Sequence, residues 1–399
     1  MFESGVKPNG RSAWILTIAA CLLFPLMGFV AYAMAKPVSW NGPGKLGAIA
    51  LLFPLHLLVV SIVTAALAFL AWRARALIAL LFFVATSLLT IGMALAPTMS
   101  MWEEARRLNV NLSLRDYAKN ALHLNRGSPQ QDRSVVYGAT PDGTKLVLDV
   151  WKSSQPNTEA LRPAVVIVHG GAWNHGNRSE TPDWNRWLNE LGYQVFDVEY
   201  RMPPPARWLD EVGDVKAALA WVAANAATYR VDTSRISIMG RSAGGNLSML
   251  AAYSKGSPQL PPTLGASPVR IRAVINLYGP SDIPLLYRIS KSAGYVRPNI
   301  QRYIGGTPQE FPDRYRAVSP LTYVSASSPP TIMILGTSDR LVSIDQAIEL
   351  DDALTKAGAT DEMFFLPATD HGFDANWGGF GTQIARQKVK DFLRRYEWR

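Results

Sequence analysis

A serine flanked by glycines lies in the segment IMGRSAGGNL, residues 238–247, where Gly240 and Gly244 each stand two positions from Ser242. In this Gly-x-Ser-x-Gly pattern a strand turns sharply into a helix, and the serine side chain is exposed at the turn. Glycines are needed there because a Cβ would collide with the neighbouring strand or helix. The pattern is short and recurs by chance, so predicting Ser242 as a nucleophile depends on partners elsewhere in the chain.

The first partner is a base, because a serine hydroxyl attacks only when a base accepts its proton and a carboxylate orients that base. The chain has five histidines, and His371 in PATDHGF directly follows the last expected strand. We predict His371 as the base. The other histidines lie in or beside other elements: His56, His123, His169 and His175.

The second partner is an acid, expected at the end of the strand before the histidine. The segment TIMILGTSDRLV places Asp339 there. Asp370 and Asp374 flank His371, but neighbours in sequence rarely have the geometry to bond the far side of the ring, so Asp339 is preferred. Serine, aspartate and histidine then occur in the chain order of an α/β-hydrolase.

A carbonyl under attack also needs hydrogen-bond donors for its developing negative charge. The segment HGGAW follows an expected strand, and its glycines allow backbone N–H groups to point at one spot. We predict an oxyanion hole from Gly170, Gly171 and Ala172 together with Ala243, at the positive end of the helix that begins there. Taken alone, the HGG segment fits an ordinary strand-to-loop turn equally well.

The elements that position these residues are short apolar runs, separated by longer helical segments, from about residue 132 onward. Two strands with a Pro-Asp-Gly turn at 141–143 predict an opening hairpin. The remaining runs are continuously apolar, as in strands buried on both faces of a parallel sheet. The expected strands are SVVY, KLVLDVW, AVVIVHGG, YQVFDVEY, RISIMG, IRAVINLYG, TIMILG and EMFFLP.

Amphipathic segments occupy the intervals between these strands. Apolar residues recur at helical spacing from Val212 to Val222, and similar patterns span Ala347–Ala357, with Gly358 as a stop, and Gln383–Tyr396. Alternating strands and helices predict an α/β fold with a mostly parallel central sheet covered by helices on both faces. Functional residues collect at the carboxyl ends of strands in such sheets.

The first hundred residues have a different character. Three uncharged, mostly apolar runs, Ser12–Ala35, Leu46–Trp72 and Ala76–Trp102, are each long enough to cross a bilayer as a helix. The first is too long for a signal peptide, and two more follow. We predict a membrane domain over 1–102 with helices at about 12–35, 46–72 and 76–100, a connector at 103–131 and a catalytic domain over 132–399. The connector is expected either as an amphipathic segment near the membrane surface or as a solvated helix.

The charge distribution agrees with a membrane location. Residues 1–134 have 12 lysines and arginines against 5 acidic residues, whereas residues 135–399 have 28 against 26, so the net charge of +9 belongs mainly to the membrane part. It suits lipid headgroups, and no basic run in the larger part predicts nucleic-acid binding. The tight RAR cluster at 73–75 favours a cytoplasmic N-terminus and an extracytoplasmic catalytic domain. We expect a multi-pass protein of a bacterial inner or plasma membrane.

Residues from about 132 to 398 resemble an α/β-hydrolase of the esterase and lipase type, similar to hormone-sensitive lipase, in the branch with a His-Gly-Gly-x-Trp oxyanion loop. The segments that carry the resemblance are HGGAW, EYRMPP, the long run from DVKAALAW to GRSAGGNLS, YGPSD, YIGGTP, SPLTYV, GTSDRLV and DHGF. The resemblance implies Ser242 as nucleophile, Asp339 as acid and His371 as base. Ala172 departs from relatives with a third glycine. The branch also includes feruloyl esterase-like and kynurenine formamidase-like enzymes.

Several other residues have a structural interpretation that we prefer. For Trp173, Trp184 and Trp187 we expect core packing or a surface cap rather than a substrate groove. Arg241 is expected to pair with a local carboxylate rather than with substrate. The stretch 284–320 is too long for a simple connection and is predicted to form a cap. No cofactor or metal site is predicted, and Cys21, the one cysteine, permits no disulfide within the chain.

These observations predict a membrane-anchored serine carboxylic ester hydrolase that acts on small or lipophilic esters through an acyl-enzyme intermediate, with the lipid bilayer as its surroundings and no obligate protein partner. The alternatives are an amidase, formamidase or peptidase with the same triad, a membrane sensor that binds ligand without turnover, and an acyltransferase. A complete triad argues against the sensor.

Overall fold

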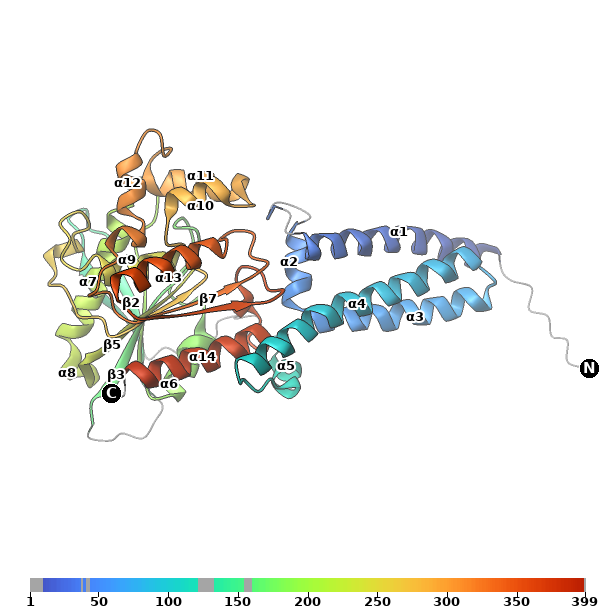
Figure 1. The fold of residues 1–399 in the computed structure, drawn as a ribbon, viewed down its shortest axis with the longest axis horizontal. Coiled ribbons are helices and arrows are strands. Elements are labelled where there is room, and N and C mark those ends of the chain that lie inside the picture. Colours follow the sequence, from blue (N-terminus) through green and yellow to red (C-terminus); the bar gives the residue numbers. More distant parts are fainter. Residues whose placement is uncertain (1–9, 37–38, 41–43, 121–132, 154–159, 398–399) are drawn as a thin grey trace, which may run out of the picture.

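The computed structural model describes residues 10–36, 39–40, 44–120, 133–153 and 160–397, and His123 lies outside them. It has two parts (Figure 1). A bundle of long helices from the N-terminal hundred residues extends from one side of a larger α/β part, and the described C-terminal end lies in the α/β part.

In the described part of the chain, eight strands form one sheet in the order β1-β2-β4-β3-β5-β6-β7-β8. The strands β1 and β2 pair antiparallel as the predicted hairpin, β2 pairs antiparallel with β4, and the other neighbours are parallel. Their bounds are β1 Arg133–Ala139, β2 Lys145–Trp151, β3 Arg162–Val168, β4 Gln194–Val198, β5 Val231–Arg241, β6 Val274–Leu277, β7 Thr331–Gly336 and β8 Asp361–Leu366.

Helices cover both faces of this sheet, which is why its central strands are continuously apolar. In Figure 1, α6 (Pro182–Glu190) and α14 (Phe380–Glu397) lie on one side of the strands. The helices α7 (Asp210–Ala224), α9 (Ala243–Tyr253) and α13 (Asp345–Ala357) lie on the other side. All residues of β4, β6 and β7 are buried. The mostly parallel, doubly covered sheet predicted from the sequence is confirmed.

Two predicted helices have the expected local determinants. The apolar stripe predicted from Val212 to Val222 is buried within α7. The helix α13 ends at Gly358, which has a left-handed conformation with φ of 72° and donates its backbone N–H to Thr355 O. A residue with a Cβ is strained in that conformation, so glycine stops the helix at low cost.

The N-terminal part contains three helices that are long and apolar enough to cross a membrane, within the described residues: Gly10–Ala35, Pro54–Arg73 and Leu77–Arg107. They correspond to α1, to the turn η1 (Pro54–His56) with α3 (Leu57–Arg73), and to α4. The predicted second span at 46–72 is wrong as a single helix, because its first part forms the separate short helix α2 (Gly44–Leu52).

The break between α2 and η1 has a local and a tertiary cause. Pro54 has no backbone N–H to continue a helix, and Phe53 before it leaves the helical region with φ of −127° and ψ of 53°. Pro25 and Pro97 nevertheless lie inside α1 and α4, so proline alone does not decide the break. The carbonyl of Leu52 accepts a hydrogen bond from Asn376 of the α/β part, which holds α2 at the junction of the two parts (Figure 1).

The region predicted as a connector begins as a continuation of α4, which ends at Arg107. The short helix α5 (Leu114–Asn120) follows and packs on the α/β part, where Tyr117 stacks on Phe380 with ring centroids 4.9 Å apart. The helical bundle is therefore joined to the α/β part both through α2 and through α5.

Candidate active site

Ser242 stands at the sharp turn between β5 and α9, with φ of 53° and ψ of −122°. This conformation is uncommon for a residue with a side chain and is typical of a strained functional turn. A Cβ added at Gly240 would lie 2.0 Å from Gly244 O, and one added at Gly244 would lie 2.1 Å from Val168 O. Both glycines are therefore required by close backbone contacts, for the steric reason expected from the sequence.

His371 lies between the other two residues predicted for the triad. Its Nε2 is 2.8 Å from Ser242 Oγ, and its Nδ1 is 2.8 Å from Asp339 Oδ2. The serine directly follows β5, the aspartate follows β7 and the histidine follows β8, so all three lie at the carboxyl ends of parallel strands.

Asp339 is held in place by backbone donors. Its Oδ1 accepts hydrogen bonds from the N–H groups of Leu341 and Val342, both at 2.8 Å, which leaves Oδ2 directed at the histidine. The side chain is almost completely buried. The carboxylate can therefore fix the orientation of the imidazole, which a base in this position requires.

The two acidic residues that flank His371 in the sequence form hydrogen bonds and ion pairs with groups other than its imidazole ring. Asp370 accepts from the backbone N–H groups of Arg340 and His371. Asp374 accepts from the indole N–H of Trp184 at 2.8 Å and pairs with Arg241 at 2.7 Å. Burial, and next the charge of Asp339, raise the pKa of Asp370 to about 6, while Arg340 opposes the shift.

The loop after β3 lies directly against the serine turn. A Cβ on Gly170 would lie 2.9 Å from Arg241 O and 3.4 Å from the Cβ of Ser242. Gly171 has φ of 118° and its carbonyl accepts the N–H groups of Asn174 and His175, which folds the loop tightly. Ala172 has φ of 50°, a left-handed conformation that is more strained for a residue with a Cβ than for glycine. Ala243 is the first residue of α9.

Asn246 on α9 joins these segments, and the sequence analysis missed it. Its amide donates to Pro280 O and Val318 O, both at 3.1 Å, and its Oδ1 accepts from Trp173 Nε1 at 3.3 Å. This single buried side chain links the loop after β3, the helix behind the nucleophile and the segment before α10. Only its place one turn after Ser242 could have indicated a role.

Arg241 pairs with a local carboxylate, that of Asp374, as expected from the sequence. Besides Asp374, it donates to the hydroxyl of Tyr278 at 2.9 Å, and Tyr278 in turn donates to Asp374. Burial raises the pKa of Tyr278 well above its usual value, so the phenol stays protonated. The ring of Tyr278 packs edge-on against His371 with centroids 4.7 Å apart, so this cluster lies directly against the predicted base.

The tryptophans also pack in the core. Trp184 is fully buried and Trp173 nearly so. Trp173 stacks on Tyr303 of α11 (Ala293–Ile304) at 5.1 Å. Trp187 contacts Trp184 edge to face. The stretch predicted as a cap forms α10 (Ile283–Ile289), α11 and α12 (Pro312–Ala317), and its α11 touches the loop after β3 through a bond from Asn174 to Asn299 O at 3.0 Å.

Arg340, beside the aspartate of the triad, is the second residue that the sequence analysis missed. It is completely buried, and its Nε lies 2.5 Å from Asp370 Oδ2, a contact of opposite charges whose angles are not those of a hydrogen bond. Its guanidinium also donates to the carbonyl of Gly44 at the start of α2 and to that of Ala33 near the end of α1 at 3.3 Å. Arg340 therefore connects the loops that carry Asp339 and His371 to the N-terminal helices α1 and α2.

Comparisons with known proteins agree with this architecture. The family model described as BD-FAE matches residues 148–354, which is more than half of the chain. The chain belongs to the BD-FAE family. Its members are α/β-hydrolases of the esterase type, as the resemblance to the hormone-sensitive lipase group predicted, and the matched range includes Ser242 and Asp339 but ends before His371.

Curated relatives of this BD-FAE chain are named as esterases. The "Probable carboxylic ester hydrolase LipM" of Mycobacterium tuberculosis is 33% identical over 61% of the chain, and "Esterase LipQ" of the same organism is 29% identical over 74%. "Isoprenylcysteine alpha-carbonyl methylesterase ICME" of Arabidopsis thaliana is 28% identical over 61%. The matches span 56%, 69% and 57% of the length of these relatives.

Solved structures show the same fold. A "truncated form of carbohydrate esterase from gut microbiota" has a TM-score of 0.57 and 25% identity, and covers 68% of this chain and 99% of its own. Esterase 2 of Thermogutta terrifontis with bound propionate has a TM-score of 0.56 over 67% of this chain and 96% of its own, and at 23% identity it supports the fold alone.

Proposed function

We propose that this protein is a membrane-anchored serine hydrolase that cleaves carboxylic esters through an acyl-enzyme intermediate. The observation that carries the proposal is the continuous hydrogen-bond chain from Ser242 through His371 to Asp339, with 2.8 Å at each step, beside the HGG loop. The esterase names of its BD-FAE relatives support the choice of esters as the bond class.

In the first half-reaction, Ser242 Oγ attacks the ester carbonyl carbon while its proton moves to His371 Nε2. The carbonyl oxygen becomes negative, and backbone N–H groups of Gly170–Ala172 and Ala243 stabilise it, aided by the N-terminus of α9. The C–O bond to the alcohol then breaks, and His371 returns its proton to the leaving oxygen. Asp339 keeps the imidazole oriented and stabilises its positive form throughout.

In the second half-reaction, His371 takes a proton from water, and the resulting hydroxide attacks the acyl-enzyme carbonyl. Collapse of the second tetrahedral intermediate breaks the bond to Ser242 Oγ, which recovers the proton from His371. The products are one carboxylic acid and one alcohol, and no cofactor takes part in these steps.

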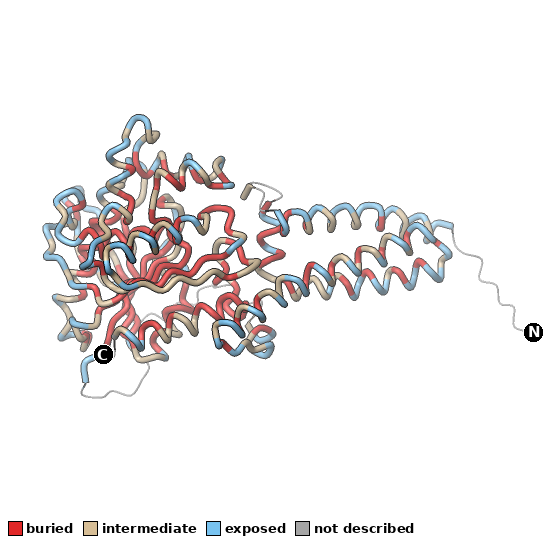
Figure 2. The backbone as a smooth tube through the Cα atoms, in the orientation of Figure 1, coloured by how far each residue is buried: buried red, intermediate tan, exposed pale blue. Residues whose placement is uncertain are grey.

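The membrane location rests on α1, the span Pro54–Arg73 and α4. Their outward faces are exposed along the bundle, where apolar side chains have no protein partner in the described chain (Figure 2). A bilayer would cover such faces. Arg73 and Arg75 lie at the end of the bundle away from the α/β part, and we propose that this end is cytoplasmic and the catalytic part extracytoplasmic (Figure 1).

The test measures hydrolysis of p-nitrophenyl acetate, butyrate and palmitate by the detergent-solubilised full chain and by its Ser242→Ala variant. We expect the variant to lose at least about a thousandfold in kcat, as loss of a triad nucleophile causes. Ser327→Ala, which changes an exposed serine far along the chain, is the matched control and should keep full activity. Activity that survives in Ser242→Ala would overturn the mechanism, and p-nitroanilide cleavage at a rate equal to that of the esters would favour an amidase.

A further inference from the structure

A partly open cavity of about 90 Å³ lies where the N-terminal helices meet the α/β part. A space of about 10–15 Å³ is enough to hold one water molecule, so this cavity takes several methylene groups. Its lining is mainly apolar and comes from both parts: α2 and η1 supply Ala48, Leu52 and Pro54, and the segment after β8 supplies His371 and Phe373.

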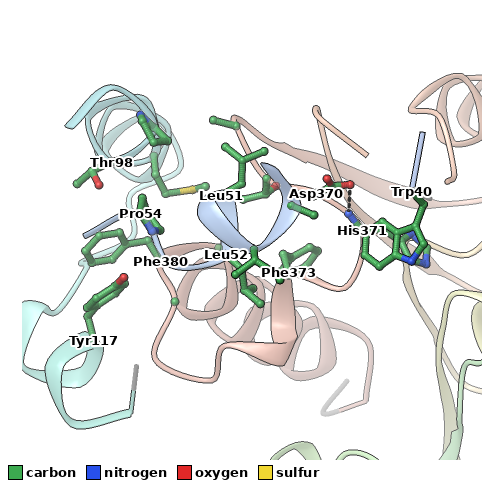
Figure 3. A pocket seen from close by; sticks show the side chains of 18 residues that line it. Trp40, Leu51, Leu52, Pro54, Thr98, Tyr117, Asp370, His371, Phe373 and Phe380 are labelled. Carbon is green, nitrogen blue, oxygen red and sulfur yellow. Dashed lines mark hydrogen bonds between the residues drawn. The ribbon is translucent and has the colours of Figure 1, made fainter. Parts of the chain in front are cut away.

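The cavity connects the predicted base with the membrane helices. In Figure 3, His371 and Trp40 stand at one end of the view and Tyr117 and Thr98 at the other, with Leu52 between them. The neighbouring α2 residue Ile49 also lines the cavity and is largely exposed, so the cavity reaches the outer face of the junction at α2.

The length of α4 places this junction at the edge of the bilayer. Its 31 residues extend about 46 Å, whereas the hydrocarbon core is about 30 Å thick and is crossed by about 20 residues. Counted from Leu77, beside the charged turn at 73–75, the core ends near Pro97. Pro97, Thr98 and Met101 line the cavity, so an apolar chain can pass from lipid into it without crossing bulk water.

The wall that α2 provides is held at a defined position. Asn376 of the α/β part donates to Leu52 O at 2.8 Å, and buried Arg340 donates to Gly44 O, so both ends of α2 are tied to loops of the catalytic part. Arg340 is itself paired with Asp370, next to the base. A wall fixed in this way can select substrates by shape, which a loosely attached helix could not do.

The cavity borders the predicted base and not the predicted nucleophile. His371 lines it, whereas neither Ser242 nor the HGG loop does. In ester cleavage the carbonyl oxygen faces the oxyanion donors, while the leaving alcohol oxygen receives its proton from the histidine. A cavity that borders His371 is therefore placed to receive the chain attached to the leaving oxygen.

We propose that this cavity receives the apolar chain of the ester's alcohol, and that the membrane helices thereby select esters of lipophilic alcohols. The inference rests on the proposed function and adds the substrate class. In it, Ala48 and Leu52 of α2 are specificity-determining residues supplied by the membrane part, which the matched BD-FAE range at 148–354 does not include.

The test compares ethyl acetate with hexyl acetate for the full-length protein and its Ala48→Phe variant, in which a ring occupies the cavity. Burial of one methylene is worth about a fourfold factor in affinity. We therefore expect kcat/KM for hexyl acetate to fall at least about tenfold, from the loss of two or more methylene sites, and that for ethyl acetate to change by less than about twofold. Ala66→Phe, the same change at an exposed position of α3, should alter neither.

Equal losses on both acetates, or no change on either, would overturn the inference. A loss confined to p-nitrophenyl hexanoate relative to p-nitrophenyl acetate would overturn it too, because the cavity would then hold the acyl chain. If Ala48→Phe does not fold, the Leu52→Ala variant provides the test, because it enlarges the cavity. It should raise kcat/KM for acetates of alcohols longer than hexanol relative to kcat/KM for ethyl acetate. An unchanged ratio contradicts the proposal. Ethyl acetate hydrolysis that depends on Ser242 tests the proposed function separately.

Discussion

The central strands and the N-terminal helices are both strongly apolar, but they place their apolar side chains in opposite directions. Val165 and Val166 in β3 are fully buried, whereas Trp14 and Leu22 in α1 are 71% and 68% exposed. Figure 2 shows the same contrast between the buried sheet and the outward faces of the long helices. An exposed apolar surface of that extent is compatible with a membrane anchor, whereas the buried strands form a core that excludes water.

The buried sheet holds the predicted catalytic groups at the ends of its strands. The largest effect on activity is therefore expected from substitutions at these strand ends. Asp339→Asn keeps the shape of the side chain but removes the charge that orients His371. We expect kcat for p-nitrophenyl acetate to fall by about 10³- to 10⁴-fold with a small change in KM. Asp352→Asn, an exposed change on α13, is the control. Full activity of Asp339→Asn would show that another carboxylate orients the base.

The next prediction compares the same Leu→Ala substitution in the sheet and in the N-terminal helices. Leu148→Ala in β2 removes a fully buried side chain and should cost about 2–5 kcal/mol of unfolding free energy. Leu22→Ala in α1 removes a side chain that is mostly exposed and packs on no core, so its cost should be about 0.5 kcal/mol or less. Unfolding of the purified protein in detergent measures both, and equal costs would remove the distinction between the regions.

An arginine introduced into α1 tests directly whether this helix lies in a bilayer. Leu22→Arg puts a cation near the middle of α1, where insertion into a bilayer should become about 3 kcal/mol less favourable. Leu161→Arg, at a residue 53% exposed on the α/β part, should have no such cost. Membrane fractionation and glycosylation mapping of the two variants give the measurement. Normal insertion of Leu22→Arg would mean that α1 does not cross the bilayer.

The smallest effect is expected at the edge strand β8, which is only partly buried. Burial, and next the neighbouring Asp351, raise the pKa of Asp361 to about 7, above its value in an unfolded chain. A raised carboxyl pKa favours the protonated folded state, so this contribution to stability is present below about pH 4 and is lost as pH rises through about 7. Asp361→Asn should therefore raise the unfolding midpoint relative to the parent at pH 8 and leave it unchanged near pH 4. An equal shift at both pH values would contradict the coupling.

Much of the fold follows from local patterns. The apolar strand runs, the stripe of α7 and the glycine that ends α13 act through neighbours in the chain, and the structure has each element where the pattern predicts it. The steric need for Gly240 and Gly244 was equally local, because the serine turn itself forces the backbone together. The catalytic roles of Ser242, Asp339 and His371 stay predictions, which their geometry supports.

Other features depend on which distant segments meet. The run at 46–72 has the composition of one membrane helix, yet it divides before Pro54, where the proline and the bond from Asn376 of the α/β part to Leu52 O act together. Asn246 and Arg340 resemble ordinary polar residues in the sequence. Their partners, Val318 for one and Ala33 for the other, are far away along the chain.

The sequence by itself therefore determined the sheet, the apolar helices and the residue types available for catalysis, because periodicity, glycine geometry and chain order are properties of neighbouring residues. Only the tertiary structure decided that the N-terminal helices form one wall of a cavity beside His371. Burial of Arg340 is possible only where two carbonyls and a carboxylate from separate segments converge to satisfy its charge and its N–H groups.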